Sequence, residues 1–448
     1  MKKKSNAKLI NGDIGKTLFK MTMPMLMGIF GMILFNLVDT YFVGILGVDE
    51  LAAISFTFPV IMIIMSIAMG LGIGASSVIA REIGTGNMDQ VKQYTTNVLI
   101  LAFIIVVVLV ILGLLTLNPL FRLLGAKQEL IPLIRDYMII WYLGVPFVVI
   151  PMVSNHVIRS TGDTKSPGII MMVAVVVNMI MDPLLIFGIG PFPRLELKGA
   201  ALATLIARAC VMVFAFYILH KREKLISLKL PSLKPMLNSW GKILYVAIPT
   251  SLTNLITPIT LAIITMIVSH YGKNAVAGFG IASRVEMFSL AILMALSVVI
   301  APFTGQNYGA KKYNRIMKGI KLSTNFSLIY GLVIMVFFLI FAKSIASIFT
   351  DNIEVINNAQ LVLTILSISW GANGIIKIST SVFNAINKPL LSTMVILFQM
   401  VILLIPMAFL GSKLYGFKGI FIACALAHII AGISAYFFTP GICIKLKK

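Results

Sequence analysis

Charged residues are scarce in this sequence, and their scarcity excludes most classes of soluble protein. Only 12% of the 448 residues are Asp, Glu, Lys or Arg, whereas about a quarter of an average globular protein is charged. Hydrophobic residues make up 59% of the chain. Many of them form runs that are long enough for membrane-spanning helices of roughly 20 residues. We therefore expect an all-α polytopic membrane protein.

Cysteines and catalytic motifs are also few. Cys210, Cys424 and Cys443 lie in or beside apolar runs without paired spacing, so neither a disulfide framework nor a zinc site is indicated. The sequence contains no HExxH motif, nucleophile elbow or P-loop. We therefore expect no cofactor, no ATP-driven step and no enzymatic activity. The net charge of +22 would suggest nucleic acid for a soluble protein, but here a membrane explains it better, and we expect no nucleic-acid partner.

What the sequence has in abundance is long apolar segments, which we interpret as twelve transmembrane helices. Several exceed the length that a straight crossing needs, so we expect tilted or kinked helices. The predicted spans are approximately 17–45, 51–80, 93–117, 130–158, 167–190, 198–219, 242–270, 275–304, 319–342, 355–384, 389–411 and 417–440.

The placement of Lys and Arg gives the orientation of these spans. Basic residues concentrate in the N-terminal segment, in the loops after even-numbered spans and in the C-terminal tail. The positive-inside rule then places both termini in the cytoplasm. The N-terminal segment lacks a cleavable signal pattern. We expect a multi-pass protein of the plasma (cytoplasmic) membrane that contacts membrane lipids and is a monomer.

The two halves of the chain repeat one another. At one constant offset Pro24 aligns with Pro249, and Gly84 aligns with Gly309. Each half has an even number of spans, so both halves enter the membrane from the same side. We therefore expect two homologous six-helix lobes, a parallel repeat with a pseudo-two-fold axis along the membrane normal. The predicted parts are an N-terminal lobe (1–220), a basic cytoplasmic linker (221–241) and a C-terminal lobe (242–448).

The chemistry of the N-terminal lobe centres on two acids in apolar helices. Asp39 lies near Asn36 and Thr40, and Asn178 and Asp182 share a helix face at i,i+4. A charged side chain at the bilayer centre costs about 2.5–3.5 kcal/mol on insertion scales, so such acids usually have a function. We interpret them as a proton or Na⁺ site. The alternative is that they are buried polar residues that fix helix packing.

The repeat itself tests that interpretation, because the second copy lacks both acids. The positions of Asp39 and Asp182 become Ile264 and Ile405 there. A carboxylate needed only for the fold should more often occur in both copies, so we place the ion chemistry in the N-terminal lobe. Three further residues are candidates for this site: Thr204 as an extra oxygen ligand, and Tyr137 and Asn155 in a supporting network.

The C-terminal lobe carries three charges inside predicted spans, namely Arg284, Glu286 and Lys377. Arg284 and Glu286 are two residues apart and do not face each other on a helix, so each needs a partner elsewhere. An interior ionisable residue is a functional candidate by default. An ion role for Glu286, and a cavity-facing or acid-neutralising role for Lys377, both stay open.

Several motifs resemble the multidrug and toxic compound extrusion (MATE) family, in particular its prokaryotic DinF-like branch. They are VDTYFVGILGVDELAAIS (38–55), REIGTGN (81–87), RSTGDTKSP (159–167), NMIMDP (178–183) and KGAALAT (198–204), together with the early Pro24.

This resemblance implies a role for several residues and a function for the chain. Positions matching Asp39, Asn178, Asp182 and Thr204 are implicated in Na⁺ or H⁺ coupling, and Pro24 is a candidate hinge. The implied function is a secondary active antiporter that exports amphipathic, often cationic, drug-like compounds by alternating access. The alternatives are a flippase for lipids or lipid-linked sugars, and a polytopic membrane enzyme.

Overall fold

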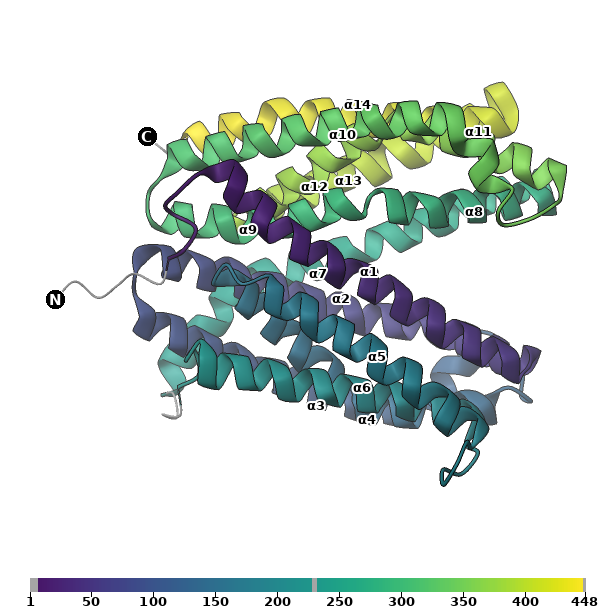
Figure 1. Ribbon diagram of the computed structural model, residues 1–448, viewed down its shortest axis with the longest axis horizontal. Coiled ribbons are helices and arrows are strands. Elements are labelled where there is room, and N and C mark those ends of the chain that lie inside the picture. The colour runs from purple at the N-terminus through teal and green to yellow at the C-terminus, as the bar shows by residue number, and fades with distance from the viewer. Residues whose placement is uncertain (1–6, 228–231, 446–448) are drawn as a thin grey trace. The chain divides into compact units, whose positions relative to one another are not determined.

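The chain is almost entirely helical (Figure 1). The computed structural model describes residues 7–227 and 232–445, except for some side chains between residues 36 and 51 and those of residues 444–445. The helices follow the long apolar runs, and glycine or asparagine marks several of their ends. Gly86 ends α2 with φ +84°, a left-handed conformation that glycine adopts without strain. The Asn87 side chain then caps α3 by accepting a hydrogen bond from the Gln90 amide.

Contacts divide the chain into two compact units, Met23–Ser251 and Ala7–Thr22 with Leu252–Lys448. The first unit contains most of α1 (Ile14–Leu46), α2 to α6, a π-helical turn and the start of α7 (Leu233–Ser269). The remaining elements of the first unit are α2 (Val48–Thr85), α3 (Met88–Leu123), α4 (Ile131–Ser160), α5 (Lys165–Phe187), α6 (Glu196–Tyr217) and η1 (Ile218–Arg222).

Small residues allow the helices of the first unit to approach closely. A Cβ on Gly199 of α6 would collide with the Leu185 carbonyl of α5, and one on Gly113 of α3 would enter the Tyr142 ring of α4. Without water between helices in a membrane, such close packing contributes much of the association energy. The α5–α6 pair, which carries several predicted site residues, is therefore held in a fixed register.

The second unit contains helices that are broken where the sequence predicts continuous spans. The predicted span 275–304 is two helices, α8 (Lys273–Ser289) and α9 (Ala291–Gly309), and it is followed by α10 (Tyr313–Ala346). The predicted span 355–384 is also two helices, α11 (Ile353–Ser367) and α12 (Trp370–Ala385), which are bent by 54°. Neither break contains proline or glycine, so the sequence offers no local signal for it.

Side chains from a neighbouring helix donate hydrogen bonds to backbone carbonyls near these breaks. The Tyr330 hydroxyl of α10 donates to the Ser289 carbonyl at 2.7 Å, where α8 ends. The Ser327 hydroxyl donates to the Gly371 carbonyl at 2.8 Å, in the first turn of α12. Backbone carbonyls in a membrane protein interior need such donors because water is scarce there. The breaks are thus built features of this unit.

The last helices of the chain continue this irregularity. α13 (Pro389–Leu397) runs into a π-helical stretch, η2 (Phe398–Leu404), and then into α14 (Ile405–Lys445). Within α14 the backbone is not helical at Tyr415 and Gly416, the point at which the sequence predicts the boundary between its last two spans. The described residues contain ten helices apolar and long enough to cross a membrane, or eleven if the bent α11–α12 pair is one span.

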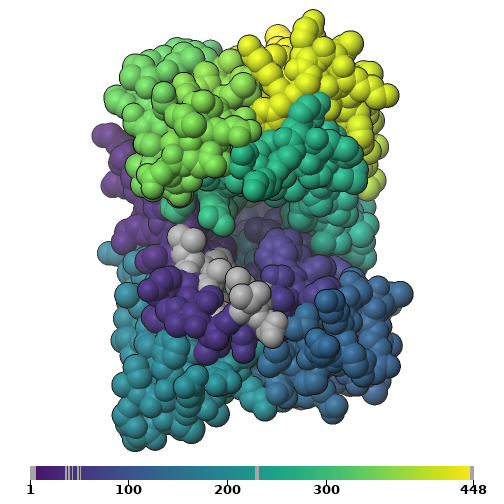
Figure 2. Space-filling view, turned by 90° about the vertical axis from the view of Figure 1, so that its right-hand side faces the viewer, coloured from purple at the N-terminus to yellow at the C-terminus, as the bar shows by residue number. Residues whose placement is uncertain are grey.

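Large aromatic side chains fill the core of the second unit. Phe338 of α10 and Trp370 of α12 are almost fully buried, with ring centroids 5.2 Å apart in an edge-to-face arrangement. Phe421 of α14 belongs to the same cluster. In the space-filling view, the green helices of this unit lie against yellow α14 (Figure 2).

A short segment before α1 also belongs to the second unit. The Leu9 amide donates to the Gln306 side chain, and Arg315 donates to the carbonyls of Leu9, Asn11 and Gly12. Leu9 is only 3% exposed. α1 therefore starts among residues of the second unit and passes into the first unit between Thr22 and Met23.

Candidate functional site

The central feature of the first unit is a buried amide–carboxylate pair on α5. The Asn178 Nδ2 donates to Asp182 Oδ1 at 3.0 Å, and both side chains are completely buried. The i,i+4 spacing places the two groups on one helix face, as the sequence predicts. The Asn178 Oδ1 is shielded from solvent and has no hydrogen-bond partner among the described residues. A buried acceptor of this kind beside a carboxylate offers oxygen ligands to a cation or an acceptor to a proton donor.

α6 brings Thr204 to the same level. The two helices run antiparallel through a short connection and lie side by side (Figure 1). The Leu195 amide donates to the Leu185 carbonyl, and Gly199 packs against Leu185. Thr204 lies further along α6 from Gly199, and the turn between Asn178 and Asp182 lies a similar number of residues before Leu185 on α5. Because the two helices are antiparallel, half-buried Thr204 is level with that turn. The structure thus places these three predicted residues at one level of the α5–α6 pair.

α1 passes the same level beside α5. Gly28 packs on Gly168 of α5, and further along the Phe42 ring meets the Phe187 ring at 6.3 Å. α1 and α5 therefore run in the same direction, and the turn of α1 before Phe42 lies level with Asp182. The Arg208 guanidinium of α6 stacks over the Phe35 ring at 4.7 Å, which fixes the start of that turn.

The three predicted residues of that α1 turn, Asn36, Asp39 and Thr40, have side chains outside the described residues. Their helix is described, so the register above applies to their position along α1. The predicted role of Asp39 in a proton or Na⁺ site with Asp182 stays a prediction.

Tyr137 and Asn155 of α4 are both buried but are far apart. Gly144 of α4 packs against Leu205, which lies level with the Asn178–Asp182 pair. At 1.5 Å rise per residue, Tyr137 is about 10 Å from that level in one direction and Asn155 about 16 Å in the other. They cannot both contact one ion, so a role in the same network would have to be indirect.

Pro24 lies within a continuous α1 and close to the point where this helix passes between the two units. Its carbonyl oxygen faces Gly168 of α5, where a Cβ would come within 2.5 Å of it. The proline itself removes one backbone hydrogen bond and weakens the helix there. The predicted hinge thus coincides with a close α1–α5 contact.

The second unit contains a cavity of about 340 Å³ that brings two of its interior charges together. Glu286 of α8 and Lys377 of α12 both line the cavity and lie close enough to interact electrostatically. Arg284, two residues before Glu286, has an exposed side chain and does not line the cavity. Lys377 therefore lies near a carboxylate and lines a cavity, and the two roles that the sequence left open for it stay predictions.

Several polar residues of this cavity were missed from the sequence. Gln399, Thr260, Ser283 and His428 line it together with Glu286 and Lys377. Gln399 is a lone amide in the apolar run 389–411, which was a usable signal. The others look like ordinary core or helix-face residues, and only the tertiary structure brings them to one place.

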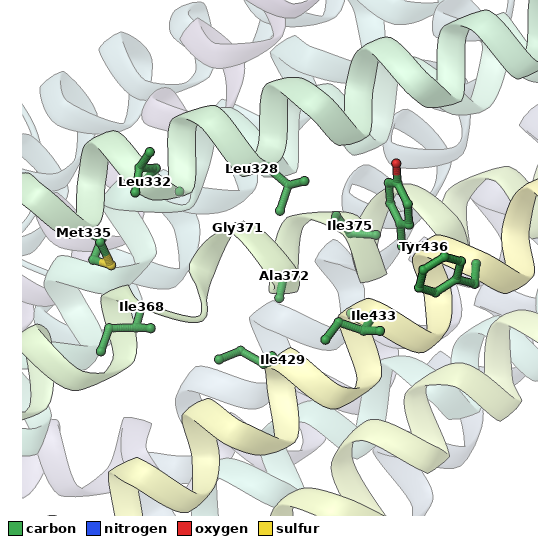
Figure 3. Close-up of a pocket in the computed structure, with 13 residues that line it drawn as sticks. Leu328, Leu332, Met335, Ile368, Gly371, Ala372, Ile375, Ile429, Ile433 and Tyr436 are labelled. Atoms are coloured by element: carbon green, nitrogen blue, oxygen red, sulfur yellow. The ribbon is translucent and has the colours of Figure 1, made fainter.

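A second hollow in this unit is almost purely apolar (Figure 3). It measures about 410 Å³ and lies between α10, α12 and α14. Leu328 and Leu332 project from one side, and Ile429 and Ile433 from the other. Among the described residues that line this hollow, Tyr436 contributes the only hydroxyl. None of the described lining residues offers a charge for an ion or for a polar ligand.

Among the described side chains, no group of three or more His, Cys, Asp or Glu residues could hold a metal ion. Asn178, Asp182 and Thr204 nevertheless offer the hard oxygen atoms that an alkali cation takes.

Comparison with known proteins identifies the family. The MatE family model matches residues 24–184 and 249–410, one match in each half of the chain. The chain is 40% identical to a FAD transporter of Shewanella oneidensis, over 98% of this chain and 97% of that protein. The chain belongs to the MATE family.

Other similar proteins are a multidrug exporter and a solved MATE transporter. The multidrug export protein MepA of Staphylococcus aureus is 25% identical, over 94% of this chain and 92% of that protein. The structure of the Vibrio cholerae MATE transporter VcmN in its bent form matches with a TM-score of 0.92 and 31% identity, covering 99% of each chain.

These findings confirm the all-helical, two-lobe fold and the MATE resemblance seen in the sequence. Solved MATE transporters match the whole chain, which is consistent with twelve helices in two lobes. The protein is a multi-pass membrane transporter and not an enzyme.

Proposed function

We propose that this transporter exports an organic substrate in exchange for H⁺ or Na⁺, and that the coupling ion binds at the α5 pair of the first unit. The observation that supports this proposal is the Asn178–Asp182 hydrogen bond of 3.0 Å between two fully buried side chains. A completely buried carboxylate is expensive unless it is paired or protonated, which suits a group that binds and releases a cation.

Coupling requires the ion and the substrate each to prefer one state of the transporter. Asp182 and Thr204 lie on neighbouring helices, level with the α1 turn that carries Asp39. Ion binding there changes the charge between α1, α5 and α6. Because Pro24 weakens α1 near its passage between the units, a change in how α1 packs on α5 is the movement that we expect to follow.

For the substrate, we first propose amphipathic, often cationic, drug-like compounds. The S. aureus and Bacillus subtilis relatives are named as multidrug proteins, and methionines and aromatic residues are plentiful in this chain. Such side chains form soft, adaptable surfaces that accommodate varied apolar ligands.

A second candidate substrate is FAD. The S. oneidensis FAD transporter is more similar to this chain than the multidrug relatives above, at 40% identity. A positively charged side chain, Lys377, also lines the cavity of the second unit. FAD carries a negative pyrophosphate, which a lysine attracts.

The test is transport in proteoliposomes that contain the purified protein and are given either a pH gradient or a Na⁺ gradient. Ethidium and FAD would be supplied separately. We expect at least one gradient to drive at least one substrate, and Asp182→Asn to abolish driven transport while the protein stays folded. Asp136→Asn is the matched control, since this α4 acid pairs with Lys198 at the surface.

If Asp182→Asn transports at the rate of the wild type, the α5 pair is not the coupling site. If neither gradient drives either substrate with folded wild-type protein, the antiporter proposal is wrong. The relative rates with ethidium and FAD decide between the two substrate classes.

A further inference from the structure

Three irregular helix segments of the second unit meet at one cavity. It is lined by Leu290 at the α8–α9 break, by Leu366 just before the α11–α12 break and by Gln399 in the π-helical stretch η2. Discontinuous helices in transporters commonly frame binding sites, and π-helical segments are frequent at functional sites. Their convergence on one cavity of about 340 Å³ points to a ligand site.

The charges in this cavity balance each other. Glu286 and Lys377 come from different helices and interact electrostatically. His428 of α14 lines the same space, and its Nδ1 lies 3.3 Å from the Ser369 hydroxyl. A ligand entering here meets one ammonium group and one carboxylate, a donor and an acceptor next to each other. A cation would be repelled by Lys377 and an anion by Glu286, so the cavity favours an uncharged group that presents both an acceptor and a donor.

Three polar groups of the lining have unused hydrogen-bonding capacity. The Thr260 hydroxyl, the Ser283 hydroxyl and the Gln399 amide nitrogen are shielded from solvent and have no hydrogen-bond partner among the described residues. Buried polar groups without partners are uncommon and costly. A rotation between staggered side-chain conformers can turn such a group towards a bound molecule. A ligand with several acceptor atoms would relieve this cost.

Much of the remaining lining is apolar and aromatic. Phe279 and Phe421 lie with ring centroids 5.5 Å apart at 38°, and Leu261 and Ile264 continue the surface. Such side chains pack on the face of a planar ring. The volume is at the small end of the range for ligand pockets, about 300–1,000 Å³, so it suits one ring system and not a whole dinucleotide.

We propose that this cavity binds an uncharged planar heteroaromatic ring that carries carbonyl acceptors and a ring N–H, of the kind found in the isoalloxazine ring of flavins. Gln399 and Lys377 donate to the carbonyl edge, Glu286 accepts from the ring N–H, and Phe279 and Phe421 contact the ring. The ring is taken to be part of the exported substrate, so this inference rests on the proposed function for its role in transport.

The test is direct binding of riboflavin, which has the isoalloxazine ring and no phosphate, to the purified full-length protein. Flavin fluorescence would report binding, and ethidium would serve as the cationic aromatic probe. We expect Gln399→Leu to weaken riboflavin binding by about 3- to 10-fold and Lys377→Met by about 10-fold or more, in line with one neutral and one charged hydrogen bond. Ethidium should not lose affinity in Lys377→Met.

Matched controls separate a binding effect from unfolding. Gln360→Leu on α11 and Lys343→Met at the end of α10 make the same chemical changes outside the cavity lining, and both should bind riboflavin like the wild type. Thermal unfolding in detergent shows that each variant is folded. If a variant does not fold, Ser283→Ala provides the same test with a smaller change and an expected loss of about 3-fold or more.

Equal riboflavin affinity in the wild type and in the folded cavity variants would overturn this inference. Tighter binding of ethidium than of riboflavin, unchanged by Lys377→Met, would overturn it as well. Asp182→Asn distinguishes this inference from the proposed function, because it should lose ion-driven export and still bind riboflavin. Cavity-dependent binding without ion-driven export would leave the inference standing and remove the antiporter. Ion-driven export that is insensitive to the cavity variants would do the reverse.

Discussion

Gly168→Ala tests whether the close contact of α1 on α5 determines the geometry of the first unit. A Cβ at this position would lie 2.5 Å from the Pro24 carbonyl oxygen, whereas real Cβ atoms essentially never come closer than 3.0 Å. The obstacle is backbone, which cannot rotate away as a side chain can. The two helices must therefore separate by about half an ångström or more. Because α5 carries Asn178 and Asp182, we also expect slower ion-driven export.

Two opposing contributions determine the change in unfolding free energy of Gly168→Ala. Overpacking in a well-packed interior costs about 1–3 kcal/mol, and replacing glycine by alanine in a helix returns up to about 1 kcal/mol. We expect Gly168→Ala to lose about 1–2 kcal/mol of unfolding free energy, measured by denaturant or thermal unfolding in detergent.

The matched control for this substitution is Gly280→Ala on α8, where a new Cβ would meet no atom within 4 Å. It keeps only the favourable helix term and should gain up to about 1 kcal/mol. If Gly168→Ala were as stable as Gly280→Ala, the α1–α5 contact would be looser than described, and the register of α1 on α5 would lose its basis.

Two further predictions concern contacts of the second unit. Tyr330→Phe removes the donor to the Ser289 carbonyl at the α8–α9 break and should cost about 1–3 kcal/mol of unfolding free energy. Tyr415→Phe, at an exposed position, should cost almost nothing, and equal values for the two variants would contradict a structural role for the Tyr330 hydrogen bond. Arg315→Ala removes the donors to the Leu9, Asn11 and Gly12 carbonyls. Limited proteolysis should therefore cut the segment before α1 faster in this variant than in Lys318→Ala. Equal cutting rates in the two variants would show that other contacts hold this segment.

The parts of this structure that depend on local chemistry could be predicted from the sequence. The i,i+4 spacing of Asn178 and Asp182 is enough to put them in contact, because helix geometry determines that distance. The apolar runs likewise determine the helices. The level of Thr204 beside this pair was also foreseeable as a possibility, but only the Gly199–Leu185 contact establishes it.

The parts that depend on tertiary contacts could not be predicted. The break at Leu290 has no proline or glycine, and a hydroxyl from α10 at Tyr330 takes up the carbonyl beside it. The cavity that pairs Glu286 with Lys377 depends on that break and on the bend before Trp370. Residues more than ninety positions apart must come together first, and a single sequence contains no spacing rule for that.

The two proposed sites lie in different units, which constrains how they can influence each other. Asn178 and Asp182 belong to the first unit, whereas Glu286, Lys377 and Gln399 belong to the second. An ion at the first site and a ring at the second therefore cannot compete for the same atoms. Any coupling between them has to act through states of the transporter that the two ligands prefer differently, and it must be reciprocal. As the ion concentration rises, the coupling ion should therefore shift the riboflavin affinity only up to a finite limit. In Asp182→Asn this shift should be absent. Displacement of riboflavin that grows without limit would mean that ion and ring share one site, in which case at least one of the two assignments is wrong.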